Sequence, residues 1–180
     1  MLRLSMIIGC LMLSTALVLA ADDAATVKAV AKLTPSKAAA TQPANTNVTG
    51  TVTFTQSGGK VTFVADVDGL SPGKHGFHIH AGNDLSAPDL SSAKGHFNPG
   101  KEKHGGPDTP HHHAGDLGNL VADDNGHAHL EGTVADVTLD GTNSIVDKSV
   151  IVHAKEDDLK TDPAGNSGGR VAGGVIELQK

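Results

Sequence analysis

Short stretches of alternating apolar and polar residues recur along most of the chain. The clearest is Val48–Thr55, in which Val52 and Phe54 share one face and threonines occupy the other. The alternation returns in Lys60–Val67, after a turn at Ser57–Gly59. Because successive side chains of a strand point to opposite faces of a sheet, these two segments predict a β-hairpin.

Six further segments have the apolar patterning of short strands and are separated by Gly, Asn and Asp turns. They are Thr26–Leu33, His75–His80, Asp116–Ala122, His127–Leu139, Lys148–His153 and Val171–Leu178. Together with the hairpin they give about eight strands, a common number for a small antiparallel barrel. The pattern therefore predicts an all-β fold in a closed or nearly closed barrel.

Two segments lack strand patterning. Pro35–Asn47 is rich in Ala, Thr and Pro and reads as a solvated loop. Ala81–His112 contains Pro, Gly, Asp and His and is far longer than the usual connection between strands. Because unstructured connections of that length usually serve a function, we expect this loop to carry part of a site.

The first residues have the pattern of a secretory leader. Arg3 precedes the apolar run Met6–Ala20, which ends in small residues. We expect residues 1–21 to be cleaved and 22–180 to form a single domain, exported to the periplasm or cell exterior. A membrane anchor is the alternative, but the run is short for a spanning helix. Cys10 lies in a lipoprotein-like sequence, so lipidation is a lesser alternative.

Charge and cysteine content narrow the class of protein further. The formal net charge is −6, and it becomes −7 when Arg3 is removed with the leader. An acidic protein is a poor partner for nucleic acid or for an anionic membrane. Cys10 is the only cysteine, so the exported domain has no disulfide. Bound metal is a candidate for the missing brace.

Eleven histidines are present, all between His75 and His153. His78 and His80 flank Ile79 on a predicted strand, so both imidazoles face the same side, outside the core. Such a pair can converge on one metal ion. Taken alone, it fits a solvated pair of strand histidines equally well.

The other candidate ligands lie in polar turns and at a strand end. Imidazole suits copper and zinc, and a carboxylate among imidazoles is compatible with zinc. These candidates are His96, His104, His113, Asp116 and His153.

The flanking sequences extend the pattern beyond the histidines themselves. The segments, in order, are Gly76-Phe77-His78-Ile79-His80, His96-Phe97-Asn98-Pro99, His104-Gly105-Gly106-Pro107, His113-Ala114-Gly115-Asp116-Leu117-Gly118-Asn119, Val152-His153, Gly165-Asn166 and Gly169-Arg170-Val171-Ala172. In order, spacing and neighbours they resemble the copper/zinc superoxide dismutases, from Thr26 to the C-terminus. The resemblance implies an eight-stranded antiparallel Greek-key β-barrel or sandwich with two long functional loops.

The resemblance also implies a ligand set. The implied copper ligands are His78, His80, His96 and His153, and the implied zinc ligands are His96, His104, His113 and Asp116. His96 would then bridge the two metals. His111 and His112 are alternatives for the third zinc ligand, although the spacing to Asp116 favours His113.

Asp157 matches a carboxylate that, in the family, links the non-coordinating nitrogens of His78 and His104. Such partners fix ring orientation and basicity. The alternative is a solvated loop acid beside Asp158.

The implied activity is dismutation of superoxide to oxygen and hydrogen peroxide by alternate reduction and reoxidation of copper, with a structural zinc. The implied catalytic residues are Arg170, which docks the anion, and His96, which handles a proton. Arg170 is the only arginine besides Arg3, and guanidinium suits small anions. The alternatives are a surface arginine at Arg170 and, for the whole protein, a non-enzymatic copper or zinc store; a plain adhesion domain explains none of the spacing.

Two departures from the family pattern stand out. Its usual disulfide would join the region of Pro88–Leu90 to Gly173, and neither holds a cysteine. The Asp157–Gly169 loop is short and offers only Lys160 as a cation. Steering would then be weaker, or would come from other lysines of the long loop, Lys101 and Lys103, and prolines would stiffen that loop. A homodimer remains open.

Overall fold

The computed structural model describes residues 26–41 and 45–180. Within these residues it contains eight strands and two short 3-10 helices, η1 (Lys37–Thr41) and η3 (Ser91–Ala93). The strands are β1 (Val27–Pro35), β2 (Thr49–Ser57), β3 (Lys60–Asp68), β4 (Gly73–His80), β5 (Asp116–Ala122), β6 (Ala128–Val134), β7 (Ser149–His153) and β8 (Arg170–Leu178).

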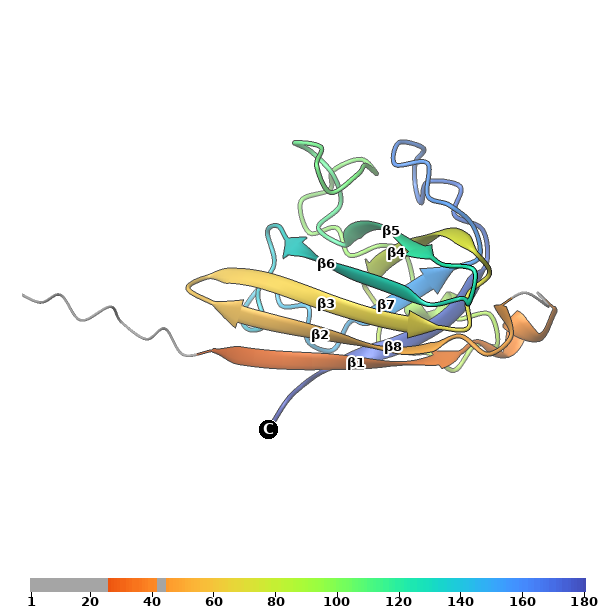
Figure 1. Cartoon of the computed structure of the whole chain (residues 1–180). Coiled ribbons are helices and arrows are strands. Elements are labelled where there is room, and N and C mark those ends of the chain that lie inside the picture. The colour runs from red at the N-terminus through yellow and green to blue at the C-terminus, as the bar shows by residue number, and fades with distance from the viewer. Residues whose placement is uncertain (1–25, 42–44) are drawn as a thin grey trace, which may run out of the picture.

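All eight strands join one antiparallel sheet in the order β5-β4-β7-β8-β1-β2-β3-β6. The two end strands, β5 and β6, lie beside each other, so the sheet curls into a nearly closed barrel (Figure 1). β3 pairs with β6 rather than with β4, so the chain crosses the barrel between them. The expected all-β barrel is therefore confirmed.

The β2–β3 hairpin has the register that the sequence pattern predicts. Phe54 lies opposite Phe63, and both side chains are buried in the core. Gly58 and Gly59 in the turn have φ of 55° and 80°. Positive φ at both central residues is the requirement of the two-residue turns whose twist matches that of the strands, and glycine adopts it without steric cost.

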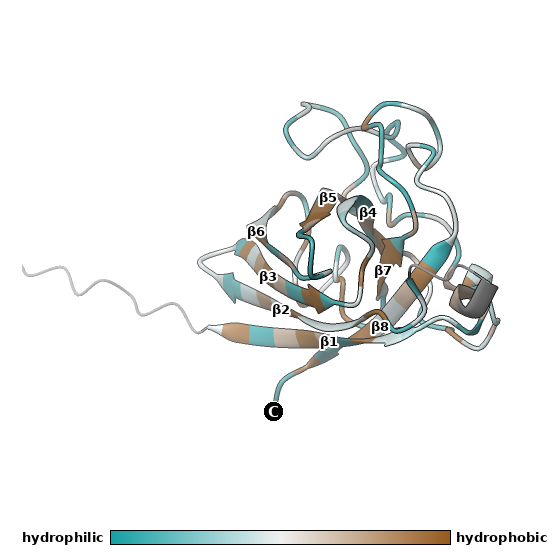
Figure 2. Cartoon of the chain, turned by 45° about the vertical axis from the view of Figure 1, so that its right-hand side comes forward, coloured by the Kyte–Doolittle hydropathy of each residue, from teal (hydrophilic) through white to brown (hydrophobic). Residues whose placement is uncertain are grey.

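The barrel interior is filled by the inward-facing apolar residues of the strands, visible as alternating bands in Figure 2. The Phe63 ring contacts two other rings, with its centroid 6.3 Å from that of Phe54 and 6.0 Å from that of Phe77. Gly132 leaves space for this ring, because a Cβ atom there would lie 2.8 Å from Phe63 Cε1. Phe77 and Ile79 point inward from β4, so His78 and His80 lie on the outer side of the barrel wall, as expected.

Two expectations need correction. The predicted strand His127–Leu139 is too long, since β6 ends at Val134 and Asp136 adopts a left-handed φ of 56°. Pro35–Asn47 is not simply a solvated loop, because its described part includes η1 and buries Ala39 and Asn45. The first expectation was wrong because apolar residues in the turn after β6 look like a continuation of the strand. The second was wrong because burial of a loop residue depends on tertiary contacts, which leave no periodic pattern in the sequence.

The expected leader 1–21, with Cys10, lies outside the described residues. In the part of the chain that the structure describes, none of the helices has the length and apolar content to cross a membrane.

The long loop after β4 is tied to the barrel at the place where the family pattern suggested a disulfide. Leu90 and Ala93 pack on Ile151 of β7 as a small apolar cluster of their own, with Leu85 at its edge. A Cβ atom at Gly173 would lie 3.1 Å from Leu90 Cδ1, so the leucine side chain occupies this position. The Ala38 and Pro88 backbones add a hydrogen bond of 2.8 Å. Apolar packing thus takes over the role of a covalent link.

We therefore expect Leu90→Ala to lower the free energy of unfolding by about 2–3 kcal/mol, through loss of buried area and the cavity left behind. Val121→Ala, at a β5 side chain that is 61% exposed, is the matched control and should change little. Denaturant unfolding of both variants, with and without a thiol reductant, provides the measurement. Equal stability of Leu90→Ala and wild type would show that the loop is held elsewhere.

Candidate metal centre

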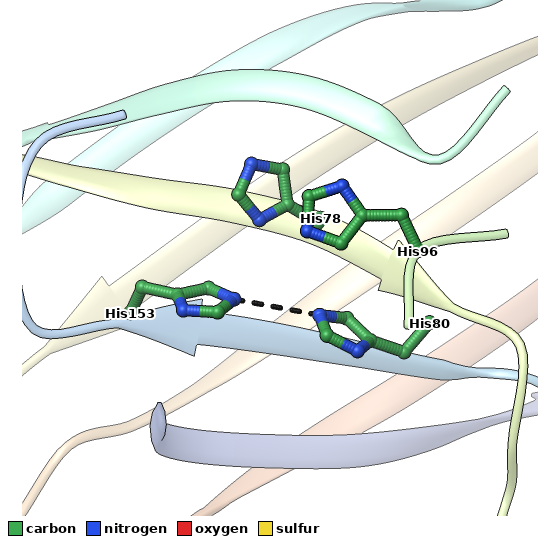
Figure 3. Close-up of side chains that lie close together, drawn as sticks. All are labelled: His78, His80, His96 and His153. Carbon is green, nitrogen blue, oxygen red and sulfur yellow. Dashed lines mark hydrogen bonds between the residues drawn. The ribbon is translucent and has the colours of Figure 1, made fainter. Parts of the chain in front are cut away.

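Four histidines from three parts of the chain converge on the outer side of the barrel wall (Figure 3). His78 and His80 come from β4, His153 ends the neighbouring strand β7, and His96 reaches in from the long loop. One ligand nitrogen from each lies within 4.8 Å of the others. An isolated bridge pairs the His80 and His96 backbones, which fixes the loop against the strand.

Hydrogen bonds settle which nitrogens of this first cluster face each other. Nδ1 of His80 lies 2.8 Å from the Lys94 carbonyl oxygen, and Nδ1 of His153 lies 3.2 Å from that of Gly168. A carbonyl only accepts, so each Nδ1 carries the proton and each Nε2 presents a lone pair. The two Nε2 atoms are 3.4 Å apart (Figure 3). Burial, followed by the neighbouring histidines, lowers the pKa of both rings well below its usual range.

A second cluster adjoins the first and shares His96 with it. His96, His104, His113 and Asp116 each place a ligand atom within 4.8 Å of the others. Asp116 Oδ1 is the common neighbour, at 2.7 Å from His96 Nδ1, 3.1 Å from His104 Nδ1 and 3.3 Å from His113 Nδ1. Three imidazoles and one carboxylate form the donor set that a tetrahedral zinc ion takes.

The Asp116 carboxylate is fixed by the backbone. Its Oδ2 accepts hydrogen bonds from the backbone N–H groups of Gly105 and His113, both at 3.0 Å. Burial would raise the pKa of Asp116, but the contacts with His104 and His96 and the backbone donor lower it far below its usual value. The group is therefore a permanent anion whose free oxygen faces the imidazoles.

Asp157 links the two clusters through ring nitrogens of His78 and His104 that face away from them. Its Oδ2 lies 2.7 Å from His78 Nε2, and its Oδ1 lies 2.9 Å from His104 Nε2. Asn119 on β5 holds the Asp157 backbone through two hydrogen bonds, of 2.8 and 3.0 Å. A Cβ atom at Gly165 would lie 1.7 Å from Asp157 Oδ1, so only glycine fits there, with φ of 61°. The carboxylate thus orients one ring of each cluster.

Three buried nitrogens test whether metal ions fit these clusters. His78 Nδ1, His96 Nε2 and His104 Nδ1 are the buried side-chain polar atoms that make no well-aligned hydrogen bond in the described residues, although His104 Nδ1 lies 3.1 Å from Asp116 Oδ1. The first two face the all-histidine cluster and the third faces the cluster with Asp116. Leaving a buried polar atom unpaired costs roughly 1–3 kcal/mol. Coordination to a cation removes that cost, so the donor sets fit copper and zinc.

Arg170, the first residue of β8, lies at the edge of the all-histidine cluster. Its Nη1 donates to the Leu90 carbonyl at 2.5 Å, and its Nη2 donates to the Lys94 carbonyl at 2.6 Å. The Lys94 oxygen thus accepts from both Arg170 and His80. Half-buried and held through two nitrogens, the guanidinium is fixed beside the histidines, not loose on the surface.

The other histidines lie apart from the clusters. His111 is 79% exposed beside Glu102, and His112 donates to the His113 carbonyl, so neither joins the second cluster. His127 and His129 lie on the barrel surface, paired with aspartates of β3.

Two supporting residues escaped the sequence analysis. His75 is buried, with ring nitrogens 2.8 Å from the His153 carbonyl and 2.9 Å from the Ser71 carbonyl. Asn119 was noted only as part of a motif, and its role depends on a partner 38 residues away. A polar amide followed by the apolar residues Leu120 to Ala122 in β5 was the available signal.

The wall of this antiparallel β-barrel carries two adjoining clusters of metal-binding side chains. One consists of imidazoles, the other of imidazoles and a carboxylate, and a single histidine belongs to both. These features define the class of two-metal β-barrel proteins. The family model for copper/zinc superoxide dismutase matches residues 48–176. Superoxide dismutase [Cu-Zn] 2 of Brassica juncea is 45% identical over 139 residues, covering 73% of this chain and 91% of that protein.

A crystal structure of the clock protein EA4 is also similar, with a TM-score of 0.73 and 38% identity over 84% of this chain and 94% of that one. The chain belongs to the copper/zinc superoxide dismutase family. It is accordingly an oxidoreductase with copper and zinc as cofactors and superoxide as substrate.

In the metal-free protein, two histidines should titrate at opposite extremes. Burial lowers the pKa of His78 to about 4. Burial also opposes the proton on His104, but contacts with Asp116 and Asp157 outweigh it and raise the pKa to about 10. At pH 7 we therefore expect His104 protonated and His78 neutral, as read from histidine ring resonances in an NMR titration.

Asp157→Asn removes one of the two anions, so the midpoint of His104 should fall. Asp158→Asn is the matched control, because Asp158 bonds Thr161 and Asn166 and no histidine. An unchanged His104 midpoint in Asp157→Asn would contradict the assignment of its proton to this bridge.

Proposed function

We propose that copper is held by the first cluster and zinc by the second, with His96 as a ligand to both. The observation that supports this assignment is that the two ring nitrogens of His96 face different clusters. His96 Nε2 is unpartnered and faces the all-histidine cluster, while its Nδ1 lies 2.7 Å from Asp116 in the other. An imidazole offers a ligand atom at each end only when both ring protons are absent.

The overall reaction consumes two superoxide anions and two protons and yields one oxygen and one hydrogen peroxide. Bound copper supplies the one-electron redox chemistry, and bound zinc supplies a fixed positive charge. Arg170 binds the anion through its guanidinium, which the Leu90 and Lys94 carbonyls hold in place. His96 could hold a proton at Nε2 only while that atom is not a metal ligand, and it would then donate the proton to the peroxide, while Asp116 keeps its Nδ1 side oriented.

A metal store is the competing function for the same ligands. A store needs donors but has no need of a cation fixed beside them. The two hydrogen bonds that hold Arg170 at the cluster support the enzyme, as does the family to which the chain belongs.

The proposal also includes export. The charged and apolar pattern of residues 1–21 supports a cleaved leader, after which the domain would be free of the membrane in the periplasm or cell exterior. N-terminal sequencing of the secreted protein tests it. A homodimer, supported by the family resemblance alone, is tested by the mass in solution at micromolar concentration.

Removal of a zinc ligand should lower the zinc content of the protein without lowering its copper content. We expect one copper and one zinc per chain in protein loaded with both, and His113→Ala should bind zinc about 10–100-fold more weakly while retaining copper. His129→Ala, which removes an exposed histidine, is the control. Elemental analysis measures both metals, and loss of copper without loss of zinc would reverse the assignment.

Arg170 separates an enzyme from a store. Arg170→Ala should keep both metals but slow superoxide decay about ten- to a thousand-fold, by analogy with other single electrostatic donors. Arg170→Lys should retain more activity, since the charge survives without the planar fork. Pulse radiolysis at matched copper content gives the rates, and equal rates for wild type and Arg170→Ala would favour the store.

A further inference from the structure

Two histidine–aspartate pairs lie next to each other on the outer face of the barrel, where β3 and β6 run side by side (Figure 1). His129 of β6 lies opposite Asp66 of β3, and its Nδ1 is 2.7 Å from an Asp66 oxygen. His127, just before β6, has its Nδ1 2.9 Å from an Asp68 oxygen. Because alternate residues of a strand share a face, the two pairs form neighbouring rows on one surface.

The aspartates determine which nitrogen of each ring is free. A carboxylate only accepts a hydrogen bond, so each Nδ1 carries a proton and each Nε2 of a neutral ring presents a lone pair. The His127 and His129 side chains are 48% and 52% exposed, so an ion in solvent can reach them. The hydrogen bond with Asp66 also raises the pKa of His129, which makes that ring a more basic donor.

Stability alone does not account for two such pairs, because exposed ion pairs contribute little to folding. A carboxylate bonded to one nitrogen of an imidazole is, however, the usual support of a metal-binding histidine. It fixes the tautomer and raises the basicity of the other nitrogen. In the buried clusters of this protein, Asp157 supports His78 and His104 in the same way. The surface pairs therefore repeat, in the open, an arrangement that the metal centre uses.

The spacing of the two rings suits a single ion. One residue separates His127 from His129, as one separates His78 from His80, whose ligand nitrogens lie within 4.8 Å of each other in the first cluster. Bonds of about 2.0–2.1 Å place two nitrogens of one ion within about 4 Å of each other, a separation that exposed rings reach by rotation about their side-chain bonds. Glu131, the next outward-facing residue of β6, adds a third carboxylate to the two aspartates, and this negative charge attracts a divalent cation.

We propose that His127 and His129 form a third metal site, on the barrel surface, which binds a divalent copper or zinc ion through both Nε2 atoms. Asp66 and Asp68 hold the opposite nitrogens of the rings, and water completes the coordination. Imidazole suits both ions. The inference goes beyond the proposed function and does not depend on which ion each buried cluster holds. Because two protein ligands hold an ion more weakly than four, dialysis empties this site and leaves the buried clusters loaded.

The test is a copper(II) titration of the dialysed protein with both buried clusters loaded. Copper(II) is the probe because it binds nitrogen donors more tightly than other divalent first-row ions do. Wild type should bind one further copper(II) ion per chain, followed by equilibrium dialysis and elemental analysis. The electron paramagnetic resonance signal gained during the titration should show couplings to the nitrogens of two imidazoles.

Three variants address the two ligands and their support. His127→Gln and His129→Gln each remove one ligand nitrogen and should weaken the binding of the further ion at least ten-fold, about the loss that follows when a supporting partner of a metal ligand is removed. Asp66→Asn keeps a hydrogen-bond acceptor for His129 but removes the charge, and it should weaken binding about ten-fold. All three positions are exposed, so the melting temperature of the loaded protein should change little.

His111→Gln is the matched control. His111 is also an exposed histidine beside a carboxylate, with its Nδ1 3.6 Å from Glu102, but it lies on the long loop and outside the two rows. This variant should bind the further ion as wild type does. Equal binding by wild type and both β6 variants would overturn the site, as would couplings to a single imidazole. Loss of the ion in His111→Gln alone would also overturn it, because the ion would then lie on the long loop.

Discussion

Buried imidazole nitrogens that point at one another are the constraint on which this structure depends. His80 and His153 each give their proton to a backbone carbonyl, so two lone pairs face across 3.4 Å. His78 and His96 each add a buried nitrogen without a hydrogen-bond partner among the described residues. Such an arrangement is unfavourable unless cations enter it. The barrel, the loops and the carboxylates hold this set of donors together in advance of the metals.

The outer parts of the structure can be understood as supports for that arrangement. Asp116 and Asp157 stay ionised against burial because imidazoles and backbone N–H groups surround them. The loop that carries His96 is secured by the contact of Leu90 with Ile151, without a covalent bond. Arg170 then joins the loop to β8 through two carbonyl oxygens. Each support reaches the centre from a different segment, so the site forms only when the barrel has closed.

The sequence predicted the parts governed by local periodicity or by motif. The β2–β3 hairpin and β5 follow from alternation, and the placement of His78 and His80 follows from their spacing along a strand. It could not predict contacts between distant segments that have no pattern of their own. Asn119 holding Asp157 and Leu90 filling the space at Gly173 are contacts of that kind. The end of β6 was missed because apolar residues continue past it into a turn.

His96 belongs to both clusters, and this has a thermodynamic consequence. A ligand shared by two binding sites links their occupancies, because an ion at one site fixes the orientation and proton state that the other requires. The linkage is reciprocal, so the factor by which zinc alters copper affinity equals the factor by which copper alters zinc affinity. The occupancies of the two sites are thus coupled through one side chain, and a change in the affinity of one site for its ion changes that of the other.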